Sequence, residues 1–205
     1  MFHSAANAFP LSSDQSSTAL RDRAWVAAIQ TGDALAFEAM FRAYSDELVG
    51  FAETLLHSRE AAQEVVQDLF LRIWRQRELW EFPGPLNTYL YRAARNGAIS
   101  RFRHDRIEVR FQQRVAQSGS VHAWTARQPR ADDHALEADL AAAIGRAVAE
   151  LPDRCREIFR LSRTHHLSHA EVADVLGLSV NTVEVQLTRA LAFLRKRLAD
   201  FRRAD

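Results

Sequence analysis

The chain has 205 residues, of which 47% are hydrophobic and 26% charged, and its 27 basic side chains nearly balance 26 acidic ones. This composition excludes a strongly basic tail protein and an acidic disordered protein, and the length suits one or two globular domains. A formal net charge of +1 gives no sign of a nucleic-acid binder when the chain is treated as one charged body. The single cysteine, Cys155, excludes an internal disulfide and a cysteine-rich zinc site.

No stretch of the chain approaches the roughly 18 consecutive apolar residues that a membrane helix needs, and the N-terminus has no basic head followed by an apolar core. We therefore expect a cytoplasmic protein that is not integral to a membrane, and the single cysteine is typical of a reducing compartment. Glycine and proline are scarce, with 7 and 5 residues, while Ala, Leu, Arg and Glu dominate. The predicted fold class is therefore all-α.

Residues 1–19 are rich in Ser and Ala without sustained periodicity, which predicts a flexible leader. From residue 20 to about 56, apolar residues recur every three or four positions, which predicts amphipathic helices with a break at residues 31–33. Ser58 is expected to cap the next helix, over about residues 60–75. On its polar side, an exposed leucine among polar residues is a weak sign of a protein docking face. That face comprises Glu64, Gln67, Asp68, Leu71 and Arg75.

The loop and helix that follow carry a concentration of arginine. Residues 81–85 must form a loop, because two prolines around a glycine cannot continue a helix. A helix is predicted from Leu86 to about Arg106, with five arginines against one aspartate. Such a face, with Tyr89 and Tyr91 nearby, suits a surface that grips phosphates and stacks on bases, although a solvated face has the same pattern. The stripe comprises Arg92, Arg95, Asn96, Arg103 and Arg106.

The sequence predicts two helical domains joined by a flexible linker, over residues 20–106 and 139–205. Residues 107–138 are the expected linker, because Gln, Ser, Gly and Pro are mixed there without a stable period. Further helices are predicted at about residues 136–150, 153–163, 168–176 and 179–203, with a break at Leu151–Pro152.

The most informative motif lies near the C-terminus. Ser168 followed by Glu171 predicts a capping box at the start of a short helix. Gly177 predicts the turn after that helix, and Ser179 predicts the cap of the next one. Helix, short turn and helix form the pattern of a helix-turn-helix unit, whose second helix enters the DNA major groove. An ordinary helical hairpin with a basic outer face, or a groove for another protein, remains as an alternative.

A helical wheel divides the second helix of this motif into two sides. The buried side comprises Val183, Leu187, Ala190, Leu191, Leu194, Leu198 and Phe201. The outward side, with Gln186 on its flank, comprises Asn181, Thr182, Val185, Thr188 and Arg189. Lys196 follows Arg189 by seven residues and suits a phosphate contact. Val185 can meet a thymine methyl group, whereas Glu184 would repel phosphates but can accept a hydrogen bond from a cytosine amino group.

Four segments taken in chain order resemble the successive signatures of a sigma-70 family factor of the extracytoplasmic-function (ECF) group. The first domain contains AAQEVVQDLFLRIWRQR and PLNTYLYRAARNGAISRFRHDR, and the second contains LPDRCREIFRLSR and LSHAEVADVLGLSVNTVEVQLTRALAFLRKRL. The resemblance covers about residues 33–106 and 139–200. It implies a transcription initiation factor without enzymatic residues or a cofactor, built from a sigma-2 domain and a sigma-4 domain.

The resemblance also implies a division of labour. In the first domain, the helix with Gln67, Asp68 and Leu71 would dock on the beta-prime clamp of core RNA polymerase. The segment from about Phe82 to Arg103 would melt the promoter −10 element and hold a flipped base. The second domain would read the −35 element as duplex and pack on the beta flap, while the linker threads the polymerase channels.

Several positions depart from the family pattern. Tyr89 stands where the family usually has Trp, and Ser100 stands where it usually has Asp. Basic residues are common at the positions of Glu184 and Gln186. The run Thr-Val-Glu resembles the iron-uptake branch of ECF factors, which implies an anti-sigma factor as a further partner.

A self-standing helix-turn-helix regulator with a sensor or dimerisation domain is the main alternative, and it would need a palindromic operator. A metal site at Cys155, His165, His166 and His169 is not expected, since their spacing fits no zinc signature. Local charge favours the sigma factor over a neutral helical protein. Residues 33–81 hold ten acidic and five basic side chains, whereas residues 85–116 hold seven basic and two acidic ones, and residues 181–203 hold six and two.

Overall fold

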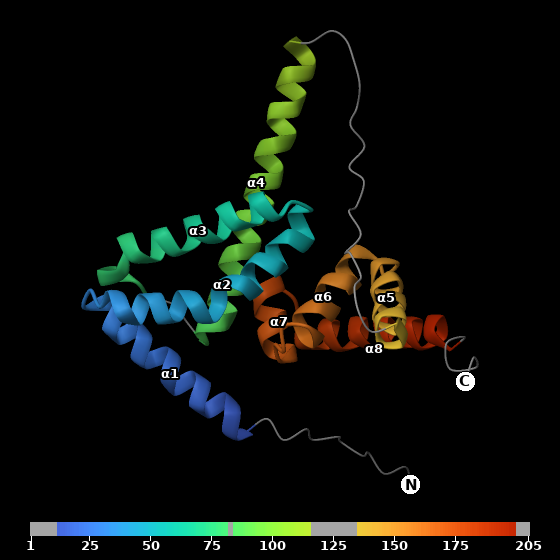
Figure 1. The fold of residues 1–205 in the computed structure, drawn as a ribbon, viewed down its shortest axis with the longest axis horizontal. Helices are drawn as coiled ribbons and strands as arrows, with labels where there is room; N and C mark the ends of the chain where they lie inside the picture. The colour runs from blue at the N-terminus through green and yellow to red at the C-terminus, as the bar shows by residue number, and fades with distance from the viewer. Residues whose placement is uncertain (1–11, 82–83, 116–134, 200–205) are drawn as a thin grey trace. The chain divides into compact units, whose positions relative to one another are not determined.

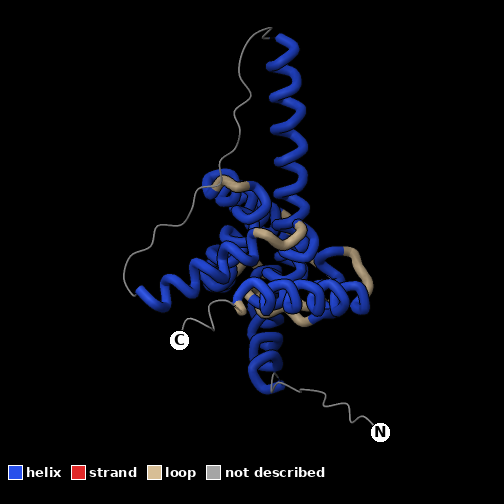
Figure 2. Tube along the Cα trace, turned by 90° about the vertical axis from the view of Figure 1, so that its right-hand side faces the viewer, coloured by secondary structure: helices blue, strands red, loops and turns tan. Residues whose placement is uncertain are grey.

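The computed structural model describes residues 12–81, 84–115 and 135–199, with side chains over residues 17–81, 84–104 and 141–199. All regular structure in these ranges is helical, which confirms the all-α prediction (Figures 1 and 2). The elements are α1 (Ser12–Gln30), α2 (Ala34–Leu56), α3 (Arg59–Arg75), the short 3-10 helix η1 (Arg77–Leu79), α4 (Leu86–Val115), α5 (Ala135–Ala149), α6 (Asp153–Arg163), α7 (His169–Leu176) and α8 (Val180–Leu198). No described helix is long and apolar enough to span a membrane.

The chain divides into two units, at Phe102 and Arg103. The first unit holds α1, α2, α3, η1 and most of the described side chains of α4, and the second holds α5 to α8. Each unit has its own buried core, so each can be treated as a separate platform for surface residues.

Polar caps set the helix boundaries of the first unit. The Asp33 carboxylate accepts from the backbone N–H groups of Leu35 and Ala36, at 2.8 and 3.1 Å, and starts α2. Gly32 has φ +91°, which lets the chain reverse between α1 and α2. Ser58 accepts from the N–H of Ala61 at 3.2 Å and starts α3. The predicted break at residues 31–33 and the predicted Ser58 cap are confirmed.

Aromatic rings and one glycine hold α2, α3 and α4 together. The rings of Phe37 and Trp74 lie 4.9 Å apart between α2 and α3, which run side by side in Figure 1. Tyr91 of α4 meets Phe51 of α2 edge-on at 5.3 Å, an arrangement worth about 1 kcal/mol beyond area burial. Gly97 lies at the contact of α4 with α3, where an added Cβ would lie 2.8 Å from a methyl carbon of Val65.

Two predicted boundaries are wrong because helices extend past them. Helix α1 begins at Ser12, inside the predicted leader, although residues 1–11 lie outside the described residues. Helix α4 continues to Val115, past its predicted end near Arg106 and into the predicted linker, whereas α5 begins at Ala135, within one residue of the helix predicted at about residues 136–150. Once part of a helix is anchored by packing, each added residue gains a hydrogen bond without a new nucleation step. The sequence also offers no glycine or proline to stop α4 between residues 98 and 118.

The second unit packs α5, α6 and α7 against α8. Its core includes Cys155 of α6, which is buried as expected of a small apolar residue. The break at Leu151–Pro152 and the helix over residues 153–163 are confirmed. The rest of this core cluster comprises Ala147, Val148, Leu151, Ala190 and Leu194.

Candidate nucleic-acid and polymerase interfaces

The predicted helix-turn-helix is present as α7 and α8. The Ser168 side chain accepts from the N–H of Glu171 at 3.3 Å, while the Glu171 carboxylate accepts from the N–H of Ser168 at 2.8 Å, completing the capping box. Gly177 ends α7 with φ +63°, and Ser179 caps α8 by accepting from the N–H of Thr182 at 3.1 Å. Arg154 of α6 donates to the carbonyl of Leu176 at 3.1 Å, which ties the turn to the rest of the unit.

Helix α8 buries one narrow side, as the wheel predicts. The fully buried residues are spaced by four, three and four positions, so a single stripe faces the core. Leu191 and Leu198 are half-buried at its margin, and Phe201 lies outside the described residues. The buried stripe comprises Val183, Leu187, Ala190 and Leu194.

Several side chains on the outward side of α8 are exposed to solvent. Asn181, Arg189 and Lys196 are exposed, and Val185 retains 42% of its accessible surface. Thr188 is also exposed, but its hydroxyl donates to the carbonyl of Glu184 at 2.9 Å, inside the helix. An exposed face with amide, guanidinium, ammonium and methyl groups suits both base edges and phosphates.

Three of the predicted reading residues are engaged by neighbours. Thr182 is half-buried, with its hydroxyl 2.8 Å from that of Ser179. Gln186 is half-buried, and its side-chain carbonyl accepts from the thiol of Cys155 at 2.7 Å. Glu184 is exposed, and its carboxylate lies 3.6 Å from Nδ1 of His169 on α7. The periodicity of one helix cannot reveal these contacts, since the last two join residues of different helices.

The predicted docking face of α3 is open along its length. All five of its residues are exposed, and Leu71 retains 41% of its accessible surface. Glu64 at one end forms an ion pair with Arg101 of α4, a contact that sequence reasoning missed. The resulting face presents one apolar side chain among acidic, amide and basic groups, namely Glu64, Gln67, Asp68, Leu71 and Arg75.

The arginine stripe of α4 is less open than the sequence predicts. Between Leu86 and Ile99, every residue except Asn96 is buried or half-buried, including Arg92 and Arg95. The reason is that this part of α4 packs on both α2 and α3. Both predicted tyrosines are covered as well, since the rings of Tyr89 and Trp80 lie 5.8 Å apart and Tyr91 is buried. Ser100 and Arg103 are exposed, while the side chain of Arg106 and residues 82–83 lie outside the described residues.

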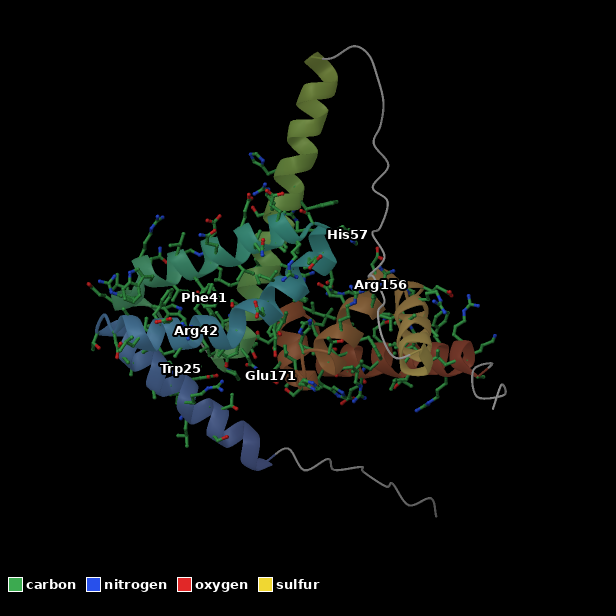
Figure 3. The ribbon with its side chains drawn as sticks, viewed as in Figure 1. Trp25, Phe41, Arg42, His57, Arg156 and Glu171 are labelled. Carbon is green, nitrogen blue, oxygen red and sulfur yellow. The ribbon has the colours of Figure 1, made fainter. Side chains whose placement is uncertain are left out.

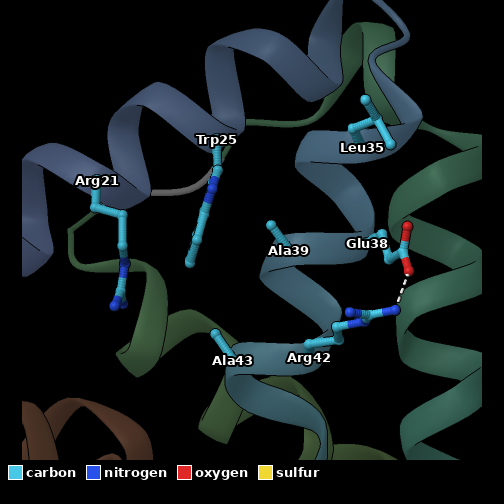
Figure 4. Close-up of a pocket in the computed structure, with 7 residues that line it drawn as sticks. All are labelled: Arg21, Trp25, Leu35, Glu38, Ala39, Arg42 and Ala43. Carbon is cyan, nitrogen blue, oxygen red and sulfur yellow. Dashed lines mark hydrogen bonds and ion pairs between the residues drawn. The ribbon is translucent and has the colours of Figure 1, made fainter.

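A groove that the sequence did not predict lies between α1 and α2, with a volume of about 690 Å³ (Figure 4). The Arg21 guanidinium lies 4.5 Å from the ring centroid of Trp25 on α1, and Arg42 pairs with Glu38 on α2 (Figures 3 and 4). Tyr44 donates to buried Asp22 at 2.6 Å, and burial together with this carboxylate raises the pKa of Tyr44. The remaining lining residues are Leu35, Ala39 and Ala43.

The three histidines at and before the start of α7 lie in different surroundings. Burial, together with the neighbouring Arg160 and His166, lowers the pKa of His165 to about 4. His166 adopts a left-handed backbone conformation with φ +55°, and His169 faces Glu184. Within the described ranges, no three His, Cys, Asp or Glu residues converge to hold a metal ion.

Comparison with known proteins assigns both units to one protein family. A model of sigma-70 region 2 matches residues 40–107, and a model of sigma-70 region 4 matches residues 141–194. The ECF RNA polymerase sigma factor SigL of Mycobacterium tuberculosis is 31% identical over 179 residues, covering 83% of this chain and 95% of that protein. This chain is an ECF sigma factor of the sigma-70 family. Sigma factors are non-enzymatic subunits that bind core RNA polymerase, and this one directs promoter-specific transcription initiation.

Further relatives agree. The ECF sigma factor SigW of Bacillus subtilis is 25% identical over 175 residues, covering 84% of this chain and 94% of that protein. A structure of CnrH in complex with the cytosolic domain of CnrY has a TM-score of 0.59 at 24% identity, and covers 88% of this chain and 98% of that one. The complex of RpoE with the anti-sigma factor NepR from Bartonella quintana has a TM-score of 0.56 at 23% identity, with 80% and 96% covered. At these identities the two structures support the fold.

The matched regions of the sigma factor contain most of the predicted surface residues. Region 2 spans the docking face of α3 and the charged part of α4, while region 4 spans α8 up to Leu194. Lys196 lies just beyond the region 4 match, and the α1 side of the groove lies before the region 2 match.

Proposed function

We propose that the outer face of α8 reads the promoter −35 element as duplex DNA. The observation that carries this proposal is the exposed side of α8. Asn181, Val185 and Arg189 are exposed there, while a single stripe of the same helix is buried in the core. Asn181 and Val185 lie in the first turns, which reach base edges in this motif, and Arg189 and Lys196 lie further along, where phosphates pass. Thr182, Glu184 and Thr188 complete the reading surface, and Gln186 lies on its flank.

The start and middle of α4 would act on the −10 element. Exposed Asn96, Ser100 and Arg103 can contact a displaced strand, and half-buried Arg92 and Arg95 lie on the same side of the helix. Tyr89, which packs on Trp80, would support this surface at the start of α4. A packed platform suits single-stranded DNA, since unstacked bases need a fixed surface to bind against.

Docking on core RNA polymerase is assigned to the open face of α3. A helix that presents Leu71 among Gln67, Asp68 and Arg75 suits a helical partner such as the beta-prime clamp, with an apolar anchor and a polar rim. The second unit would pack on the beta flap. An anti-sigma factor is a further expected partner, since RpoE in the similar structure is bound to the anti-sigma factor NepR. The site of action is the cytoplasm, where core polymerase and promoter DNA meet.

The test is site-specific photo-crosslinking in a reconstituted holoenzyme engaged on promoters found by transcript mapping. A crosslinker at Val185 should label the −35 duplex, one at Asn96 should label the non-template −10 strand, and one at Asp68 should label beta-prime. The matched control is exposed Asp46 on α2, which should label none of these. Failure to form a holoenzyme, or binding of a dimer to a palindromic operator without polymerase, would contradict the proposal.

A further inference from the structure

Helix α8 carries one acidic residue, Glu184, among four basic residues. Its side chain stands next to Val185 on the exposed surface of the helix. A carboxylate that approaches the DNA backbone meets a high density of phosphate charge, so an unrestrained Glu184 would oppose binding. A carboxylate aimed at the groove floor has a different role, since it accepts a hydrogen bond from the amino group of cytosine.

One side chain from another helix approaches the carboxylate of Glu184. Nδ1 of His169, the first residue of α7, lies 3.6 Å from Oε1 of Glu184. The other acidic group at this end of α7, Glu171, is engaged by Ser168 through its N–H at 2.8 Å and its hydroxyl at 2.7 Å. His169 therefore faces Glu184 from a helix whose start is fixed by a capping box.

We propose that His169 is a positioning residue that holds the Glu184 carboxylate for recognition of a cytosine in the −35 duplex. The inference rests on the proposed function of α8 and adds a base preference and a second residue to it. Restraining the flexible glutamate before binding reduces the rotamer freedom lost in the complex and turns the charge away from the phosphates. The imidazole also brings a polar counter-group to a carboxylate that would otherwise stand alone among base edges.

The contact can be broken without breaking the fold. Both side chains are about half exposed, at 42% and 54%, and exposed pairs of this kind contribute little to folding stability. The variants His169→Ala and Glu184→Ala are therefore expected to fold like the wild type, and changes in their DNA recognition can be assigned to the pair.

The test uses holoenzyme reconstituted from the full chain and core RNA polymerase. A pool of promoter duplexes randomised over the −35 element is bound, and the recovered DNA is sequenced. Wild type should prefer cytosine at one position by about tenfold, and Glu184→Ala should abolish that preference. Glu184→Gln should move it toward adenine, because an amide pairs with the N6 and N7 groups of adenine.

His169→Ala should weaken the cytosine preference severalfold, and His169→Gln, which keeps a donor, should restore much of it. The double variant His169→Ala, Glu184→Ala should match Glu184→Ala alone, since His169 acts through the carboxylate. The matched control His166→Asn changes an exposed histidine of the preceding loop and should leave the preference unchanged.

Two outcomes would overturn the inference. One is a preference that His169→Ala leaves intact, and the other is an equal loss of affinity for all sequences, which would show a charge effect without positioning. Wild-type holoenzyme that forms and selects a −35 sequence without this cytosine would refute the inference alone. A chain that forms no holoenzyme, or selects no −35 sequence, would refute the proposed function itself.

Discussion

Helix α8 buries one stripe of residues and leaves its outward side exposed, whereas α4 packs on two neighbouring helices, α2 and α3. On α8, exposed residues recur in every turn from Val180 onward. On α4, Asn96 alone is exposed between Leu86 and Ile99. The first arrangement leaves a helix free to enter a groove, and the second makes a rigid platform. Substitutions should therefore affect binding on α8 and stability on α4.

The largest contrast is expected from two glycine variants of the first unit. Gly97→Ala places a Cβ 2.8 Å from a Val65 methyl carbon, whereas Gly50→Ala places one where no atom lies within 4 Å. Overpacking at Gly97 should cost about 1–3 kcal/mol, while helix propensity at Gly50 should add up to about 1 kcal/mol. Chemical denaturation measures both. Equal stabilities would show that α3 and α4 do not meet tightly at this point, and Val65→Ala should relieve the Gly97→Ala variant.

On α8, Arg189→Ala should weaken binding of holoenzyme to the −35 duplex by tenfold or more, or about 1.5–2 kcal/mol, with unchanged folding stability. The physical reason is the loss of an exposed guanidinium that faces DNA. Arg195→Ala, an exposed arginine of the same helix outside the predicted reading surface, is the matched control. Fluorescence anisotropy on a labelled duplex measures the affinity. Loss of core polymerase binding in Arg189→Ala would show that this face of α8 has another partner.

Lowering the pH should reduce the folding stability of the second unit through His165. The pKa of His165 is lowered to about 4 in the folded chain, against about 6.5 when unfolded, so the unfolded state binds more protons between these values. Stability from this group is therefore complete above pH 6.5 and falls as the pH drops toward 4. Because the ring is partly exposed, the loss should be about 1–2 kcal/mol. His165→Asn should flatten the pH dependence of unfolding in this window, and an unchanged profile would contradict the burial of His165.

Asp68→Ala should reduce holoenzyme formation about fivefold, or near 1 kcal/mol, because it removes one exposed polar contact at the rim of the α3 face. Binding of −35 DNA and folding stability should not change. Gln63→Ala, exposed on the same helix but outside the predicted face, should bind polymerase normally. Competition for core polymerase against a labelled sigma factor measures the affinity. Equal losses in both variants would show that the docking face lies elsewhere on α3.

How far the sequence predicts this molecule depends on how many helices touch each residue. The caps at Ser58, Ser168 and Ser179 follow from local hydrogen bonding and are confirmed. The single buried stripe of α8 follows from helical period and is confirmed. Burial of Arg92 and Arg95 depends on two neighbouring helices, so a wheel of α4 alone could not reveal it.

The candidate sites divide in the same way. Exposure of the α3 face and of Arg189 could be predicted from periodicity. The contacts of Glu184 with His169 and of Gln186 with Cys155 join residues 15 and 31 positions apart, and a single sequence carries no signal for them. The extension of α4 to Val115 was missed because helix continuation needs no motif, only an absence of breakers.

The smallest effect should come from Gln186, and it tests whether the flank of α8 belongs to the reading surface. Its carbonyl accepts from the buried thiol of Cys155 at 2.7 Å, and a thiol is a weak donor. Gln186→Ala should therefore cost about 0.5 kcal/mol of folding stability and change affinity for the −35 duplex less than twofold. Because the amide is turned toward α6, it is poorly placed to reach DNA. An affinity loss as large as that of Arg189→Ala would show instead that the amide leaves Cys155 when DNA binds. The position of Gln186 on the helical wheel would then describe the DNA-bound state better than its contact in the free protein does.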